Sequence, residues 1–546
     1  MKRTEGKKRR QSSQGKLVGI AVALKSVDKV NHPMGEMLPE EQRVFRVEVV
    51  ESFLRCGIPL SKIDHLRHLL EKQGYRLTSS SHMAELILTI HSTEVTRLRE
   101  EMGVPAPREP PSTRPYSVIF DGSTRLGEAI AIVVSYLDYE WSIQQRLIRL
   151  DVAAKSVNAL ELSLILMECL FTRFNFRGKQ VVGVMRDGAA VNGAALQHLR
   201  VFMPNMLDVV GFSNTFDNVG KHFNTPTLDE FGQYWVRLFS SSCKAKLQWK
   251  DQTGKMPKSF SDTRWWSRWE VYNQLLEYFG DVRRFLNSNE DISPRIMDHL
   301  RVLMDDNDSL CRLNLELAAV VDIGRHFVTA TYDLEGDGAL SLCCYDRLQS
   351  VANACRPHAM SLPNVHAVAL DLAATFPDVA LDWAEDFGRQ AVRDAVLWFH
   401  RKFNGELYNT VRAFKAARLM CPATVNFLNP NADAIKQLRV FPFLDQDAIM
   451  QGLLDELSLY LAAAEDVTFP MHAVEEVTRK TVEFWRQNEK RLPNWAQAVR
   501  KVLLVQPSSA SAERVFSLLN AAFGERQINA LADYLECSVM LRYNKR

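Results

Sequence analysis

Two short apolar runs in this chain each end in an aspartate. Residues 118–120 lead into Asp121, and residues 181–185 lead into Arg186 and Asp187. Apolar runs of this length are typical of buried strands. We therefore expect two strands that each deliver one carboxylate to the same edge of a sheet, where the pair can hold a divalent cation through oxygen ligands. The alternative is that each aspartate only belongs to an Asp-Gly turn at the end of its strand.

The composition is that of a globular protein with a sizeable core. The chain has 546 residues, of which 46% are apolar and 24% are charged, so we expect several domains or one domain with a large insertion. The net charge of +2 is too small for a positively charged surface over the whole protein, so any basic patch must be local. We expect no transmembrane helix, because no run approaches ~18 apolar residues. We also expect no secretory signal, because the N-terminus lacks an apolar segment.

Nine cysteines are scattered along the chain, and none belongs to a Cys-x-x-Cys pair. This pattern is typical of a reduced, intracellular protein and not of a disulfide framework. Cys355 and His358 form a lone Cys-x-x-His. We interpret this pair as structural, because a closed zinc site needs four ligands.

The first 16 residues carry seven basic side chains and one acid. This composition predicts a disordered tail. Within it, Lys7, Lys8, Arg9 and Arg10 form a run that suits nuclear import or binding to phosphate. The alternative is an ordinary solvated tail, in which short basic runs are common.

The hydrophobic spacing changes along the chain. Apolar residues at helical spacing predict helices over residues 40–102, and a proline-rich stretch then predicts a linker. The next segment predicts a mixed α/β sheet, with strands at 116–124, 129–139, 146–152, 181–185 and 206–212 and with helices at 157–171 and 194–202. From residue 226 to about 490 the pattern is helical, and two further helices are expected near the C-terminus.

Four sequence blocks follow one another in a characteristic order. They are FDGST with Asp121, MRDGAAVN with Asp187 and Asn192, SDTRWWSRWE with Arg264 and Trp265, and PSSASAERVFSLLN at residues 507–520. In this order and spacing the chain resembles the hAT transposases (hobo, Activator, Tam3). The resemblance covers roughly residues 115–546.

The resemblance implies an α/β RNase H-like core with a mixed sheet, interrupted by a large all-α insertion and preceded by a helical N-terminal segment. The expected boundaries are a tail at 1–16, the N-terminal segment at 40–102, the first part of the core at 115–225, the insertion at 226–490, and the second part of the core with a dimerisation region at 491–546.

The resemblance also implies a catalytic triad of Asp121, Asp187 and Glu513 that binds Mg²⁺ or Mn²⁺ and cleaves and transfers DNA strands. Carboxylates suit such hard cations, and two ions can activate both the attacking and the leaving oxygen. Glu513 could instead only stabilise the first turn of a helix.

Other implied properties are DNA binding, self-association and a nuclear location. Arg264 could contact a phosphate and Trp265 could stack on a flipped base, although tryptophans at this spacing also pack in cores. The final helices resemble the family's dimerisation region, where we expect buried leucines at positions 518, 519, 531 and 541.

Two departures from the family pattern favour an alternative function. Gly211 and Asn214 stand where the family has Cys-x-x-His. Residues 1–110 contain only Cys56, so no zinc-binding BED finger is detected. The alternative to an active transposase is a domesticated or decayed copy that dimerises and binds DNA or protein without cutting.

Overall fold

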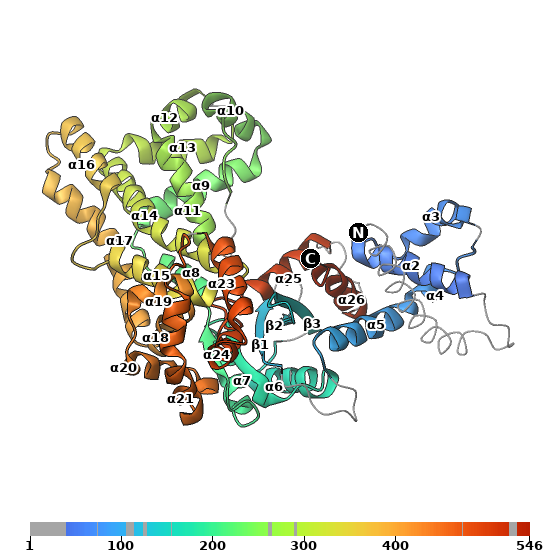
Figure 1. Ribbon diagram of the computed structural model, residues 1–546. Coiled ribbons are helices and arrows are strands. Elements are labelled where there is room, and N and C mark those ends of the chain that lie inside the picture. The colour runs from blue at the N-terminus through green and yellow to red at the C-terminus, as the bar shows by residue number, and fades with distance from the viewer. Residues whose placement is uncertain are drawn as a thin grey trace. The chain divides into compact units, whose positions relative to one another are not determined.

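The computed structural model describes residues 40–73, 75–104, 114–123, 128–153, 156–259, 265–288, 292–471, 473–522 and 532–545 (Figure 1). The predicted basic tail at 1–16 lies outside these residues. The chain divides into two compact units. We call residues 1–209, 430–467 and 479–546 the sheet unit, and residues 210–429 and 468–478 the helical unit.

The N-terminal segment is helical, as predicted. Its elements are α2 (Glu40–Cys56), α3 (Lys62–Leu70), the short turn η1 (Glu71–Gln73), α4 (Ser80–Ala84) and α5 (Leu86–Glu101). Leu54 of α2 and Leu98 of α5 are fully buried. The helical spacing of apolar residues in the sequence therefore corresponds to real buried faces.

A mixed five-stranded sheet forms the centre of the sheet unit and confirms the predicted α/β pattern. Its strands are β1 (Tyr116–Ser123), β2 (Glu128–Leu137), β3 (Ile143–Ala153), β4 (Val181–Arg186) and β5 (Leu207–Val210), in the order β3-β2-β1-β4-β5. The β1–β2 and β2–β3 pairs are antiparallel, whereas β1 and β4 are parallel. Strand β5 is shorter than the predicted run at 206–212, because the next helix begins at Phe212.

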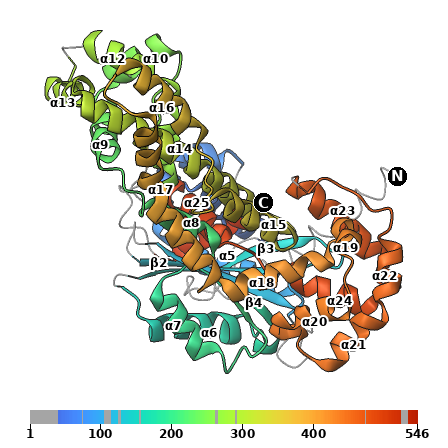
Figure 2. The ribbon, with the colours of Figure 1, turned by 90° about the vertical axis from the view of Figure 1, so that its left-hand side faces the viewer.

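Helices cover both faces of this sheet. The helix α6 (Ala159–Met167) continues as a π-helix, η2 (Glu168–Arg173), and β4 leads into α7 (Ala190–Leu199). Figures 1 and 2 both show α25 (Ala510–Ala522) on one face and α6 with α7 on the other. The chain before α25 also contacts the central strand, because the Ser117 hydroxyl donates to the Leu504 carbonyl oxygen over 2.6 Å.

The last helix, α26 (Ala532–Tyr543), completes the core of the sheet unit. It packs on β3, α2, α5 and α25. Its Leu541 is buried as predicted, as is Leu519 of α25. Leu518 is only half-buried, and residue 531 lies outside the described part of the chain.

The side chain of Asn544, directly after α26, forms hydrogen bonds with backbone groups of β3. Its side-chain oxygen accepts the Leu147 N–H over 2.8 Å, and its side-chain nitrogen donates to the Leu147 carbonyl over 3.0 Å. The same nitrogen lies 3.3 Å from Glu94 Oε1. Asn544 is 4% exposed, so these backbone groups of β3 depend on one buried amide for their hydrogen bonds.

The helical unit is built around α14 (Asn307–Leu334). Its other helices are α8 (Phe212–Gly220), α9 (Pro226–Ser241), α10 (Cys243–Thr253), α11 (Trp265–Glu277), α12 (Phe279–Ser288), α13 (Pro294–Asp305), α15 (Leu340–Ala354), α16 (Pro363–Thr375), α17 (Leu381–Asn404), α18 (Tyr408–Ala417) and α19 (Pro422–Leu428). Apart from Val210, the last residue of β5, the described part of this unit contains no strand, in line with the helical signal from residue 226 onward.

The remaining helices of the segment at 430–490 mostly group with the sheet. They are α20 (Ala432–Lys436), α21 (Asp447–Asp455), α22 (Leu457–Ala463) and α23 (Val474–Asn488), and α24 (Pro493–Val502) follows them. Trp141, next to β3, donates its indole N–H to Glu489 over 3.0 Å, and the Arg500 guanidinium lies 4.0 Å from the same ring. None of the helices in the described residues is long and apolar enough to cross a membrane.

The Asn544 contacts generate a stability prediction. Asn544→Ala should lower the free energy of unfolding by about 2 kcal/mol or more, because it leaves a buried N–H and a buried carbonyl without partners. Chemical denaturation with urea measures this loss. The neighbouring exposed change Lys545→Ala is the control, and an equal effect of both changes would contradict the role of the amide.

Candidate functional site

The two strand-end aspartates lie at the same edge of the sheet. In the parallel β1–β4 pair, Ile119 is opposite Met185. Asp121 and Asp187 each follow two residues later, so they occupy equivalent positions on neighbouring strands. Asp121 is 8% exposed, and its Oδ1 accepts the Gly122 N–H over 2.9 Å.

Asp187 is held by the first turn of α7. Its Oδ1 accepts the Ala189 N–H over 3.0 Å and a hydrogen bond from the Asn192 side-chain amide. This arrangement satisfies donors at a helix N-terminus. Its Oδ2 has no hydrogen-bond partner within the described residues, so this oxygen remains available to a ligand.

Arg186 fixes the backbone on which Asp187 stands. Its guanidinium binds both oxygens of Asp208 on β5, at 2.9 and 3.0 Å, and donates to the Asp187 carbonyl over 3.0 Å. Such a bidentate, charge-assisted contact is geometrically specific. Arg186 stands beside the second aspartate in the sequence, but no sequence pattern predicted its contact with Asp208, which lies 22 residues later.

Glu513 lies in the first turn of α25, the helix that packs on β1 and β2. Three serines near the start of this helix, Ser508, Ser509 and Ser511, are all buried. Ser511 and Arg514 both donate to Gln145 of β3, over 2.5 and 2.9 Å, which ties this turn to the sheet.

The structure brings the two strand ends together but does not join Glu513 to them in a ready-made metal cluster. Across the described residues, no three side chains of His, Cys, Asp or Glu lie in a group that could hold a metal ion. The donor set nevertheless fits a hard cation, because it consists of carboxylate oxygens.

Trp265 begins α11 in the helical unit and is only 8% exposed. Its backbone N–H donates to Asp217 over 2.7 Å, and its ring lies 4.8 Å from that of Phe223. A Cβ on Gly220 would lie 1.9 Å from the Trp265 ring, so only glycine permits this approach. The other predicted DNA contacts, Arg264 and the run from Lys7 to Arg10, lie outside the described residues.

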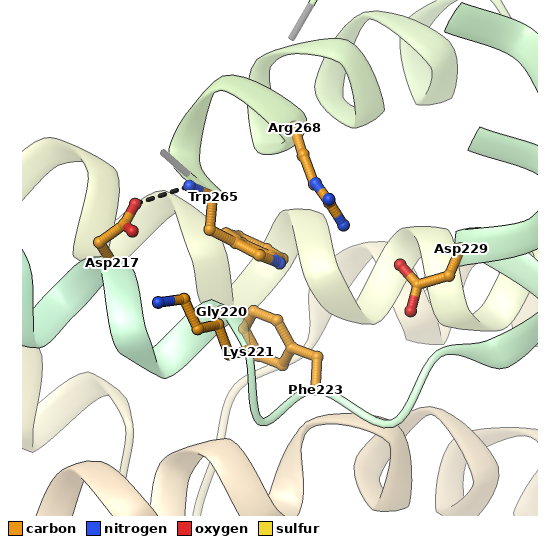
Figure 3. Close-up of a pocket in the computed structure, with 7 residues that line it drawn as sticks. All are labelled: Asp217, Gly220, Lys221, Phe223, Asp229, Trp265 and Arg268. Carbon is orange, nitrogen blue, oxygen red and sulfur yellow. Dashed lines mark hydrogen bonds between the residues drawn. The ribbon is translucent and has the colours of Figure 1, made fainter. Parts of the chain in front are cut away.

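Trp265 forms one wall of a cavity of about 220 Å³. Figure 3 shows Arg268 on the same helix as Trp265, Asp229 across from it, and Phe223 with Lys221 below the tryptophan ring. The remaining lining residues are Asp217 and Gly220. Burial raises the pKa of Asp229, and the nearby Arg268 opposes this shift. The cavity thus combines flat aromatic walls with charged groups that can hydrogen-bond a polar molecule.

Glu316 of α14 supports the helix that carries Asp229. It accepts the Leu228 N–H over 2.7 Å, at the start of α9, and is 1% exposed. Burial raises the pKa of Glu316 to about 7, although hydrogen bonds from Leu228 and Thr227 favour the charged form. Sequence reasoning missed this residue, because nothing in its local pattern marks a buried acid.

The two family departures lie at the start of α8. Gly211 is the N-cap of this helix, with φ −60° and ψ 129°, and it follows the end of β5. A glycine inside a strand lowers the stability of the fold, but Gly211 lies outside β5, so it does not have this effect here. Its backbone angles are open to any residue, and Asn214 is half-buried within the helix.

The raised pKa of Glu316 predicts a pH-dependent stability. Between pH 4.5, the ordinary pKa, and about 7, the folded protein holds a proton that the unfolded chain has lost, so stability should fall as pH rises. Glu316→Gln should remove this loss and stabilise the protein by up to about 3 kcal/mol above pH 7, relative to pH 4.5. Urea denaturation across this range measures the effect, with exposed Glu475→Gln as control. A constant difference between Glu316→Gln and the parent would contradict the assignment.

Comparison with known proteins identifies the C-terminal part of the chain. Residues 456–539 match the hAT family C-terminal dimerisation region. This region begins in front of α22 and ends within α26, so it includes Glu513 and much of the covering of the sheet. A search of curated proteins gives no match to the chain. The chain therefore contains a region similar to the C-terminal dimerisation region of the hAT family.

Proposed function

We propose that this protein is a hAT-type transposase-like enzyme that cleaves and transfers DNA strands in the presence of Mg²⁺ or Mn²⁺. The observation that carries the proposal is that Asp121 and Asp187 each follow by two residues the paired residues Ile119 and Met185 of parallel β1 and β4. The family region that contains Glu513 supports it. The strand order and the mixed pairing are consistent with an RNase H-like core with a helical insertion.

Each carboxylate has a defined task in this proposal. Asp187 uses Oδ1 for Ala189 and Asn192 and so directs Oδ2 toward a ligand. Arg186 prevents the strand end from shifting by its contacts with Asp208 and the Asp187 carbonyl. Glu513 approaches from α25. These three carboxylates would hold the cations, whose chemistry when bound would be to activate the attacking hydroxyl and to stabilise the leaving oxygen.

The cavity beside Trp265 suits an unpaired nucleotide. Its aromatic walls, Trp265 and Phe223, offer faces on which a base can stack. Lys221 and Arg268 can meet phosphate charge, and Asp229 can accept a hydrogen bond from a base. We therefore propose DNA as the partner of the helical unit, and a nuclear location follows from that partner and from the basic run at residues 7–10.

A second candidate function is a non-catalytic DNA- or protein-binding factor that dimerises. The replacement of the family Cys-x-x-His by Gly211 and Asn214 favours it. Because Gly211 is a helix cap and not a strand residue, its replacement leaves the central sheet intact. The catalytic and the non-catalytic proteins therefore differ in chemistry and not in fold.

Nicking of DNA tests the catalytic proposal. Asp187→Asn should reduce Mg²⁺-dependent nicking by about 100-fold or more. DNA affinity and stability should stay close to the parent, because an asparagine oxygen can still accept the Ala189 N–H. Exposed Asp433→Asn on α20 removes the same charge elsewhere and is the control. Nicking by Asp187→Asn at the parental rate would show that the activity does not come from this site.

Self-association tests the dimerisation proposal. Over the described part of residues 456–539, Leu459 on α22 is the one large apolar side chain that is exposed. We expect a dimer at micromolar concentration by light scattering, and Leu459→Arg should shift it toward monomer through a buried charge at the interface. The control is Leu370→Arg on α16, which is also exposed but outside this region. A strictly monomeric parent would contradict the proposal.

A further inference from the structure

A lysine-rich segment stands out in the helical unit. Residues 243–258 contain five lysines and one acid, a net charge of +4. The whole chain carries +2 and the first 16 residues carry +6, so the residues outside these two segments carry −8 in total. The positive charge of this segment is therefore local. It does not belong to a positively charged surface that extends over the whole protein.

The helix α10 holds the first lysines in a fixed arrangement. Ser242 caps it by accepting the Ala245 N–H over 3.1 Å, and Gly254 ends it with φ +74°. Trp249 on its inner face is 1% exposed and packs edge-on against Trp235 and Phe285. On this anchored helix Lys244 and Lys250 are exposed and Lys246 is half-buried.

The chain after α10 is anchored to α11. Gln274 of α11 accepts the Lys258 N–H over 2.8 Å and donates to the Met256 carbonyl over 2.9 Å. The Lys258 ammonium group pairs with Glu270 of the same helix at 2.8 Å. Lys255 lies between these anchors and Gly254, so its backbone position is also restricted.

Three of the five lysines keep their charge unpaired. Lys246, Lys250 and Lys255 have no carboxylate within ion-pair distance in the described residues, and Lys250 and Lys255 are exposed. Many other cations of the structure pair with an acid on the same helix, such as Arg312 with Asp308. Leaving three lysines unpaired in a rigid segment preserves positive charge for an external anion.

The same helix joins this segment to the cavity. Glu270 and Gln274 of α11 anchor the lysine segment, and Trp265 and Arg268 in the first turn of α11 line the cavity. A ligand that places a flat group in the cavity and extends negative charge along α11 would use both features. A DNA strand has this combination of flat bases and regularly spaced phosphates.

We propose that Lys246, Lys250 and Lys255 form a binding surface for the phosphate backbone of DNA. The proposal rests on the proposed function and names the part of the helical unit that holds the DNA next to the cavity. A membrane surface fits less well, because the apolar face of α10 is already covered by Trp235 and Phe285.

The test measures the salt dependence of DNA binding by the full chain. A fluorescein-labelled duplex is titrated in the presence of a chelator, so that binding is observed without cleavage. The triple variant Lys246→Gln, Lys250→Gln and Lys255→Gln is compared with the parent. Raising the salt from about 50 to 200 mM should weaken DNA binding by both proteins. If each lysine neutralises one phosphate, the factor by which the affinity falls should be about 40 times smaller for the variant than for the parent.

A charge-matched control separates the surface from net charge. Lys62→Gln with Lys490→Gln and Lys436→Gln removes three exposed lysines of the sheet unit and should leave the slope unchanged. If the affinity of the parent and of the triple variant depends equally on salt, the proposed binding surface is wrong. The proposed function is tested separately, by Mg²⁺-dependent nicking. Equally lysine-dependent binding to polyglutamate or to vesicles of anionic lipid would also overturn the proposed surface, because the surface would then not select DNA.

Discussion

The parallel pairing of β1 with β4 is the constraint on which the rest of the sheet unit depends. β1 lies at the centre of the sheet, with antiparallel β2 on one side and parallel β4 on the other. Only a parallel neighbour ends at the same edge, so this pairing alone places two strand-end aspartates side by side. A slip of one residue would turn one carboxylate to the opposite face. The buried side chains of both strands make such a slip costly.

The C-terminal segment closes the sheet that β1 centres. Leu504 accepts the Ser117 hydroxyl, α25 packs across β1 and β2, and Asn544 bonds to β3. The family's dimerisation region is therefore also a structural part of a single chain. Because Glu513 lies in the first turn of α25, the position of its carboxylate depends on how α25 packs on the sheet. In the proposed function, α25 would therefore contribute both to the chemistry and to the packing of the core.

Much of the sheet unit could be predicted from local sequence. The apolar runs before Asp121 and Asp187 predicted β1 and β4 closely, because buried strands need continuous apolar side chains. The helix after Asp187 begins at Ala190, four residues before the predicted start, since small residues carry little periodic signal. The run at 206–212 mixes a strand end with a helix start, and apolar content alone cannot divide them.

Contacts between distant residues could not be predicted in this way. The bonds from Arg186 to Asp208 and from Asn544 to Leu147 arise only after folding, since polar residues of these types are common on surfaces. Trp265 was open to both a core role and a binding role, and the structure shows a buried ring that is also the wall of a cavity. Glu316 likewise becomes unusual only through its burial against α9.

The central claim is that Asp121, Asp187 and Glu513 together bind a divalent cation. Electron paramagnetic resonance of Mn²⁺ titrated into the intact protein tests it without any need for DNA or turnover. The account predicts saturable Mn²⁺ binding that is lost in Asp121→Asn and weakened in Glu513→Gln, with both variants folded by circular dichroism. Unchanged Mn²⁺ affinity and stoichiometry in both variants would contradict it.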